Sequence, residues 1–376
     1  MKISCDQAKL SKGLAVVGRA VATRAVLPIT NNVLISTEQS QLKLSATNLE
    51  IALSCWIPAK IEEEGAITIP SRLITDFVNN LPSENQVDMA LSPGAKSIEL
   101  KCDRYEARIS GLDAADFPPV PEINEGTTTT VDPDALMLAI SQVVFVAATE
   151  ESRPVLTGIH AEFEGDKLTL AAADGFRLAV HKLSLSTPVE SKIAVVIPAR
   201  SLAELNRLLG EQKEPVVITI NSQNSQVLFR LKDVEMVSQL IQGTFPNYEQ
   251  LIPQSYTTRA TVDLAEFLRA TRSASIFARD GSGIIRLQVT LGEDMGKIAI
   301  SARAEEIGDD IGEISATVEG VESKIAFNSK YLLDVLGVIS EGKVALETTS
   351  PSSPGVIRPV GKDNYIHVVM PMFVQW

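Results

Sequence analysis

The sequence has few of the residues that catalytic and metal sites require. It contains three histidines, His160, His181 and His367, and they lack the spacing of metal ligands. It has no GxSxG, no P-loop and no GxGxxG followed by a helical pattern. A hydrolase would need a clustered nucleophile and base, which the sequence does not offer. We therefore expect a protein that is not an enzyme, with no catalytic residue, no metal and no cofactor.

Cysteines and long apolar runs are also scarce. Cys5, Cys55 and Cys102 are odd in number and confined to the first third of the chain, which argues against a disulfide framework or a zinc cluster. No run approaches eighteen apolar residues, and the first residues lack the apolar core of a signal peptide. A hydrophobic content of 45% with 22% charged residues is typical of globular proteins. We expect a cytoplasmic protein with no membrane partner.

Positive charge is outnumbered. Lys and Arg total 34 against 47 Asp and Glu, a net charge of −13, which at first argues against nucleic acid as a partner. The acidic pairs Glu305-Glu306 and Asp309-Asp310 could form a metal or acid–base site, but no third ligand follows at a useful spacing. A solvated acidic loop is the preferred interpretation.

What the chain does contain is a repeated hairpin pattern. Asp174-Gly175 lies between the apolar runs 168–173 and 176–180, which predicts a tight β-turn with φ > 0 at both central residues. Asp174 could instead be a catalytic acid, but a turn-forming aspartate is the preferred interpretation. Related stretches surround Ala46 and Ala302, at spacings of 127 and 129 residues from Ala173. The sequence therefore indicates one unit copied three times.

Each repeat shows two helical patterns and several short strands. The first helices follow Asp6, Asp132 and Asp263, which are potential N-caps. The second helices follow three similar entries at 69–72, 197–200 and 327–330. Apolar stripes are predicted for both sets: Leu10, Leu14, Val17 and Val21; Leu136, Ile140, Val143 and Val144; Leu264, Phe267, Leu268 and Thr271; Leu73, Phe77 and Leu81; Leu202, Leu205 and Leu209; Leu332, Val335 and Leu336. The strands are predicted at 87–91, 97–102, 216–220, 227–231 and 344–348.

Polar joints at 123–130 and 252–258 separate the repeats. The sequence thus predicts an α+β protein of three tandem domains, 1–125, 126–253 and 254–376. Each domain packs two helices against antiparallel sheet.

The predicted helices differ in charge from the rest of the chain. They hold nine basic residues against five acids: Lys9, Lys12, Arg19, Arg72, Arg200, Arg207, Arg269, Arg272 and Lys330 against Asp76, Asp134, Glu204, Glu266 and Asp334. Ordinary solvated helix faces would explain this balance as well as a binding surface would.

Several ordered motifs carry a resemblance to a known family. They are Arg24-Ala-Val-Leu-Pro-Ile-Thr-Asn-Asn32, Arg153-Pro-Val-Leu-Thr-Gly158, Ala172-Ala-Asp-Gly-Phe-Arg-Leu-Ala179, Thr244-Phe-Pro-Asn-Tyr248 and Val368-Val-Met-Pro-Met372. With them the sequence, from Met1 to Met372, resembles the bacterial DNA polymerase III β subunit, the replicative sliding clamp.

The resemblance implies a non-catalytic processivity factor within a holoenzyme that also holds a 3′–5′ exonuclease. Its members form a homodimer, a head-to-tail ring of six domains with helices lining the hole. The implied partners are double-stranded DNA, the replicative polymerase, the clamp loader and other proteins with a clamp-binding motif. Such a ring can be acidic overall, since topology rather than phosphate affinity keeps it on the duplex. An acidic peptide-binding scaffold that never encircles DNA stays open as an alternative.

The resemblance also assigns site residues. The implied peptide-binding pocket comprises Leu156, Ala173, Gly175, Phe176, Arg177, Leu178, Pro246, Leu251, Val368, Val369, Met370, Pro371 and Met372, with Arg177 at its rim. The implied DNA contacts are Arg24, Arg153, Arg279, Arg72, Arg200 and Arg207. The implied dimer interface joins Ile276 and Phe277 to Ala107 and Ile109 of the other subunit. Two departures from the family are Gln250, where some members carry a base, and the tail 373–376, which could cover the pocket, extend it or dock elsewhere.

Overall fold

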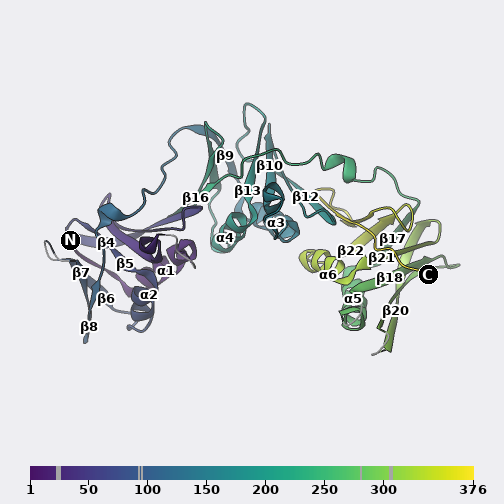
Figure 1. The fold of residues 1–376 in the computed structure, drawn as a ribbon, viewed down its shortest axis with the longest axis horizontal. Helices are drawn as coiled ribbons and strands as arrows, with labels where there is room; N and C mark the ends of the chain where they lie inside the picture. The colour runs from purple at the N-terminus through teal and green to yellow at the C-terminus, as the bar shows by residue number, and fades with distance from the viewer. Residues whose placement is uncertain (23–26, 92–93, 95, 280–281, 305–307) are drawn as a thin grey trace. The chain divides into compact units, whose positions relative to one another are not determined.

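The computed structural model describes residues 1–22, 27–91, 94, 96–279, 282–304 and 308–376 (Figure 1). These residues form two compact units, Met1–Pro133 with Glu204–Leu240 and Asp134–Ala203 with Ile241–Trp376. The first unit therefore combines the first repeat with part of the second, and the second unit combines the rest of the second with the third. Each unit contains one junction between two repeats.

The helices of the described ranges begin where the caps and strand ends predict. Asp6 accepts a hydrogen bond from Lys9 N at 3.2 Å, and Asp263 accepts one from Glu266 N at 3.0 Å. None of these helices has the length and apolar character needed to span a membrane. The α-helices are α1 Gln7–Val17, α2 Ser71–Asn79, α3 Pro133–Val143, α4 Ala199–Leu209, α5 Leu264–Arg279 and α6 Ser329–Val338. The 3₁₀ helices are η1 Gly18–Ala20, η2 Pro28–Asn31, η3 Ala114–Asp116, η4 Val144–Val146, η5 Pro154–Thr157 and η6 Glu249–Leu251.

The first unit contains one antiparallel twelve-stranded sheet with the order β8-β7-β6-β1-β4-β16-β15-β14-β9, from which β3, β2 and β5 branch at β4. The junction between repeats is the pairing of β4 with β16, from Ile51↔Ser238 to Cys55↔Val234. The strands are β1 Lys2–Asp6, β2 Asn32–Glu38, β3 Gln41–Thr47, β4 Ile51–Glu63, β5 Ala66–Pro70, β6 Gln86–Leu91, β7 Ser97–Cys102, β8 Tyr105–Ser110, β9 Gly126–Val131, β14 Val216–Asn221, β15 Gln226–Arg230 and β16 Val234–Gln239.

The second unit contains another twelve-stranded sheet, with the order β13-β10-β11-β12-β24-β23-β22-β17-β20-β19-β18-β21. Its junction is the pairing of β12 with β24, from Arg177↔Val369 to His181↔Tyr365. The strands are β10 Gly158–Glu164, β11 Lys167–Ala173, β12 Arg177–Ser184, β13 Ile193–Pro198, β17 Thr258–Asp263, β18 Ile284–Thr290, β19 Gly296–Ala304, β20 Gly308–Gly320, β21 Ser323–Asn328, β22 Lys343–Thr348, β23 Gly355–Pro359 and β24 Tyr365–Val369. The predicted strands are confirmed to within a residue at each end.

The hairpin between β11 and β12 exists, but its turn differs from the prediction. Gly175 has φ +93°, whereas Asp174 keeps a negative φ. The Asp174 side chain accepts hydrogen bonds from Phe176 N at 2.8 Å and Arg177 N at 3.0 Å. Asn48 closes the first repeat's turn in the same way, and the register aligns Thr47, not Ala46, with Ala173.

Three predicted helix stripes need correction, one of them because Val144 lies in η4, just beyond the end of α3. In α2 the buried residues are Ser71, Ile74 and Val78, while Leu73 is 53% exposed. The stripe of α2 is therefore offset by one residue from the predicted one. In the first repeat α1 ends at Val17, so Val21 lies beyond the helix.

Candidate peptide groove and DNA-facing residues

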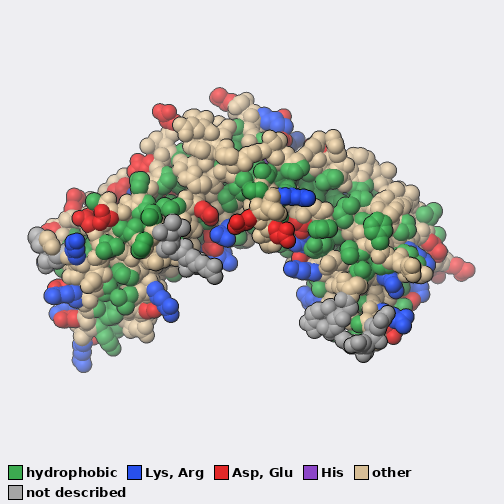
Figure 2. All heavy atoms as spheres, in the orientation of Figure 1, with side chains coloured by type: hydrophobic (Ala, Val, Ile, Leu, Met, Phe, Trp, Pro, Cys, Tyr) green, Lys and Arg blue, Asp and Glu red, His purple; other side chains and the backbone are tan. Residues whose placement is uncertain are grey.

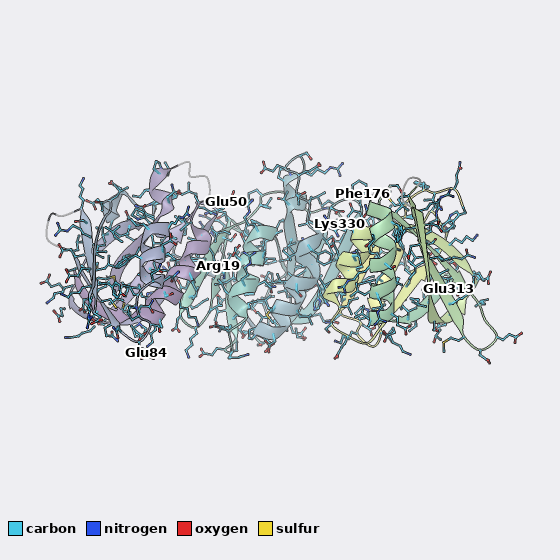
Figure 3. The ribbon with its side chains drawn as sticks, turned by 90° about the horizontal axis from the view of Figure 1, so that it is seen from below. Arg19, Glu50, Glu84, Phe176, Glu313 and Lys330 are labelled. Atoms are coloured by element: carbon cyan, nitrogen blue, oxygen red, sulfur yellow. The ribbon has the colours of Figure 1, made fainter. Side chains whose placement is uncertain are left out.

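A cavity of about 780 Å³ opens in the second unit beside the β11–β12 turn. Of the predicted pocket residues, Leu156, Gly175, Phe176 and Arg177 line it. Phe176, labelled in Figure 3 together with Lys330, is 61% exposed. The sequence interpretation missed other lining residues, which no pattern in the chain singles out: Phe145, Ala147, Ala148, Thr149, Glu150, Ser152, Lys330, Tyr331 and Asp334.

The apolar floor next to this cavity is the β12–β24 junction. Leu178 and Val368 are paired across the two strands and are buried with Leu156 and Ala173 in one cluster. Val369 is fully buried, which fits an ordinary core residue. The chain after β24 stays close, since Met370 N donates to Phe176 O at 2.8 Å. The predicted residues Pro246, Leu251 and Met370 are exposed, Pro371 is buried and Met372 is half-buried.

Arg177 is not at the rim as expected but is 9% exposed. Its Nε lies 3.0 Å from Asp174 Oδ2, and its Nη1 lies 2.6 Å from Asp334 Oδ2 on α6. Its Nη2 donates to Phe145 O at 2.9 Å, and the guanidinium lies 4.5 Å from the ring centroid of Tyr331. Arg177 therefore ties the hairpin to η4 and α6 instead of offering a free charge to a ligand.

The tail after the groove follows the edge strand β21. Met372 N donates to Ala326 O at 2.8 Å, and Lys324 Nζ lies 5.7 Å from the ring centroid of Trp376. Phe373 is highly exposed. Trp376 thus contacts a neighbouring surface, one of the three arrangements considered for the tail. On the face of the second unit that is turned to the viewer in Figure 2, hydrophobic side chains surround β12.

Two buried histidines lie on the groove strands. His181 Nδ1 is 2.7 Å from Gln142 Oε1, and its Nε2 is 3.2 Å from Asn364 Nδ2, partners that fit a neutral imidazole donating through Nδ1. His367 Nδ1 is 3.3 Å from the Tyr365 hydroxyl. Burial lowers the pKa of His181 to about 4 and that of His367 to about 3.

This burial predicts a pH-dependent stability. Both pKa values rise to the ordinary 6.5 on unfolding, so the unfolded chain binds more protons below pH 6.5. The free energy of unfolding should be highest above pH 6.5 and fall as the pH falls towards 4, by about 1.4 kcal/mol per pH unit for each histidine. Urea unfolding at several pH values between 6.5 and 5 measures this slope. The His181→Gln variant, whatever its absolute stability, should lose one histidine's share, and an equal slope in both proteins would contradict the prediction.

Comparison with known proteins decides the family. The models of the N-terminal, central and C-terminal domains of the DNA polymerase III beta subunit match residues 1–121, 130–247 and 249–373. The chain belongs to the DNA polymerase III beta subunit family. As a member it is a non-catalytic processivity factor of the replicative DNA polymerase.

The similarity to known proteins extends over nearly the whole chain. The beta sliding clamp of Synechococcus elongatus is 30% identical, with 99% of both chains covered, and that of Staphylococcus aureus is 31% identical, with 94% of both covered. The crystal structure of the Bacillus subtilis sliding clamp is 31% identical with a TM-score of 0.94, and 100% of both chains is covered. A Pseudomonas aeruginosa clamp bound to griselimycin is 29% identical with a TM-score of 0.93, again covering 100% of both chains. The clamp fold expected from the sequence is thereby confirmed.

The family resemblance also placed residues at a dimer interface. Ile276, near the end of α5, is 59% exposed and Phe277 is half-buried. On β8 of the first unit, Ala107 is half-buried and Ile109 is buried. Ile109 therefore packs in its own domain, and β8 can offer a partner its backbone edge more readily than this side chain.

The arginines implied as DNA contacts differ in their surroundings. Arg72 and Arg200 are exposed at the starts of α2 and α4, and Arg207 on α4 forms an ion pair with Glu204. Arg153 is exposed but lines the groove cavity, which places it beside Gly175. Arg24 and the side chain of Arg279 lie outside the described residues.

The two junctions differ in one side chain. Ile123 follows Pro118 by five residues, as Leu251 follows Pro246. Ile123 is buried against Ala52 and Val237, the pair that corresponds to Leu178 and Val368. Leu251 is 52% exposed. The linker thus covers the first junction's apolar pair, whereas at the second junction this linker residue stays exposed.

Proposed function

We propose that two copies of the chain close head to tail into a ring around duplex DNA. The observation that supports this best is the series of strand pairings between repeats. The strand after the first repeat's turn, β4, pairs with β16, the last strand of the second repeat. The corresponding β12 pairs with β24, the last strand of the third. The next member of the series would join β20 of the third repeat to β8, the last strand of the first.

Both of these strands have an open edge among the described residues. β8 is the terminal strand of its sheet and pairs with β7. β20 pairs with β19 from Gly308 to Ala316, and on its other side it pairs with β17 through Thr317–Gly320. Open edges of this kind invite pairing with another chain. Pairing β20 of each copy with β8 of the other would close both edges in a symmetric dimer.

Exposed apolar side chains next to these edges support the same contact. Ile311 on β20 and Ile276 on α5 are exposed in the second unit, as is Tyr105 on β8 in the first. Large apolar side chains gathered near an edge strand indicate a protein–protein surface. Within this ring the domains would be 1–125, 126–253 and 254–376, and the protein would act in the cytoplasm.

The groove would hold the partners. Its apolar floor at Leu178 and Val368, with exposed Phe176 and Met370 beside it, suits a short peptide carrying large apolar residues. We assign it the role of tethering the polymerase, the clamp loader and other partners while the ring slides. All thirteen residues implied by the resemblance lie in the second unit, so one chain would supply the whole groove.

Retention on circular DNA tests the ring. A ring placed by its loader on a nicked plasmid should stay bound through gel filtration at high salt and be lost once the plasmid is cut, because linear DNA lets it slide off. A scaffold protein that does not encircle DNA would give the same weak, salt-sensitive retention before and after cutting. That result would overturn the proposed function.

Loading should also depend on the arginines after the first helices. The Arg24→Ala, Arg153→Ala double variant should load less than wild type, and the deficit should be larger at about 50 mM than at about 200 mM salt, because a protein with fewer phosphate contacts depends less on salt. Because Arg153 also lines the groove, a peptide titration of the same variant shows whether the loader's own docking is intact. Equal loading at both salts would contradict a DNA role for these residues.

A further inference from the structure

Three basic side chains on or next to the helices of the first unit form ion pairs with acidic side chains. Arg19 Nη1, in η1 directly after α1, lies 3.6 Å from Glu204 Oε2 on α4, and the other oxygen of Glu204 accepts a hydrogen bond from Arg207. Lys12 on α1 forms an ion pair with Glu211, two residues beyond α4. Three of the residues expected to give the helices their positive charge are therefore paired within the chain.

These pairs link two repeats around one depression. A cavity of about 430 Å³ is lined by Lys12, Arg19, Arg207 and Glu211. Arg19 is labelled in Figure 3. The Glu204 side chain is 16% exposed, whereas Arg19 and Arg207 keep 38% and 59% of theirs exposed. The guanidinium groups can be reached from solvent while the carboxylate that binds both is largely covered.

A basic side chain that is already in an ion pair interacts with DNA less than an unpaired one. Each phosphate that a Lys or Arg side chain neutralises releases a counterion. It steepens the fall of log affinity with log salt concentration by about 0.9. A Lys or Arg side chain already neutralised by a carboxylate releases fewer counterions when it contacts a phosphate. The carboxylate itself also repels the phosphate. The pairing therefore lowers both the strength and the salt dependence of any contact with the duplex.

We propose that Glu204 and Glu211 are affinity-limiting residues, which hold Arg19, Arg207 and Lys12 so that the helix surface contacts DNA weakly and the ring slides. This inference rests on the proposed function, since it requires the helices to face the duplex. Glu204 and Glu211 act through the basic side chains with which they form ion pairs, and so they are positioning residues. Their effect predicts a gain in DNA binding when they are neutralised.

The test compares isosteric substitutions that each remove one negative charge. Glu211→Gln frees one basic side chain, Lys12, and Glu204→Gln frees two, Arg19 and Arg207. The control is Glu235→Gln, which breaks an ion pair with Arg230 in the same unit. Arg230 and Glu235 are cross-strand neighbours, and the adjacent pair Phe229 and Met236 is buried on the opposite face of the sheet. The control thus makes the same charge change on the other face.

The measurement is the affinity for a short labelled duplex by fluorescence anisotropy, at several salt concentrations from about 50 to 200 mM. Each freed basic side chain should steepen the salt slope by about 0.9. Over this fourfold range of salt, affinity should therefore fall about 3-fold more than in wild type for Glu211→Gln and about 12-fold more for Glu204→Gln. Affinity at the lowest salt should rise in the same order. Glu235→Gln should leave the slope as in wild type.

Several results would overturn the proposal. Unchanged slopes in both variants, with wild type binding the duplex, would show that the ion pairs do not limit DNA contact. Equal shifts in all three variants would reduce the effect to net charge. If Glu204→Gln fails to fold, Glu211→Gln decides alone, since the Glu211 side chain is 75% exposed. Wild-type protein that neither binds duplex nor is retained on circular DNA would instead overturn the proposed function itself.

Discussion

Replacing Ile276 and Phe277 together by Ala, or by a charged residue, is expected to turn the dimer into a monomer. Ile276 is 59% exposed in the single chain and would be buried by a partner's β8 edge, while Phe277 is already half-buried. Removing both should cost about 2–5 kcal/mol or more of interface packing. A loss of 3–4 kcal/mol raises a dissociation constant by about 10²–10³.

Light scattering coupled to gel filtration at micromolar concentration measures this. Wild type should elute near twice 40.5 kDa and the double variant near 40.5 kDa. Ile276→Asp alone, checked by circular dichroism, avoids disturbing the half-buried Phe277. A matched control is Val321→Asp, which changes an exposed apolar residue of the same repeat just beyond the far end of β20. A double variant that still elutes as a dimer would show that the interface lies elsewhere.

Peptide binding should be lost when the groove floor is changed. A peptide with a glutamine and two or three large apolar residues should bind with micromolar affinity, about −8 kcal/mol. Met370→Ala removes an exposed wall, and Leu178→Asp places a carboxylate in the floor, where the leucine is 2% exposed. Each should cost at least about 2 kcal/mol of binding, because the apolar side chains supply most of the affinity.

Isothermal titration calorimetry on the folded variants decides this prediction. Met295→Ala is the control, since Met295 is an exposed methionine of the same unit that is not among the groove residues. The dimer should remain in every variant. Wild-type affinity in Leu178→Asp would place the binding site elsewhere and leave the Asp174-Gly175 hairpin a purely structural element. If Leu178→Asp fails to fold, wild-type affinity in Met370→Ala carries the same conclusion.

Local patterns predicted most of the secondary structure. The stripe Leu10, Leu14 and Val17 with its cap Asp6 specified α1 because helix periodicity and capping act within a few residues. The α2 stripe failed because Leu73 and Ile74 are adjacent and both apolar, so periodicity alone does not choose between them. The turn type failed because the Asp174 side chain closes the turn itself and removes the need for positive φ at that residue.

Contacts between distant parts of the chain could not be predicted. The position of Arg177 at the rim, which the family resemblance implied, was wrong. Its burial depends on Asp334, 157 residues away, and on the carbonyl of Phe145. The ion pairs of Arg19 and Lys12 with α4 and the residues after it were hidden for the same reason. A count of charges on helices does not show which of them neutralise one another across a junction.

The buried Ile123 would limit the number of docking places in the proposed ring. The hairpin and its apolar strand pair occur at both junctions within a chain, so duplication alone would give two docking places per chain. Because Ile123 covers the first while Leu251 leaves the second more open, each chain would offer one, and a ring of two chains would hold at most two partners by this route. Polymerase, loader and other proteins would then compete for two equivalent places, and their relative concentrations and affinities would decide which enzyme works on the DNA at a given moment.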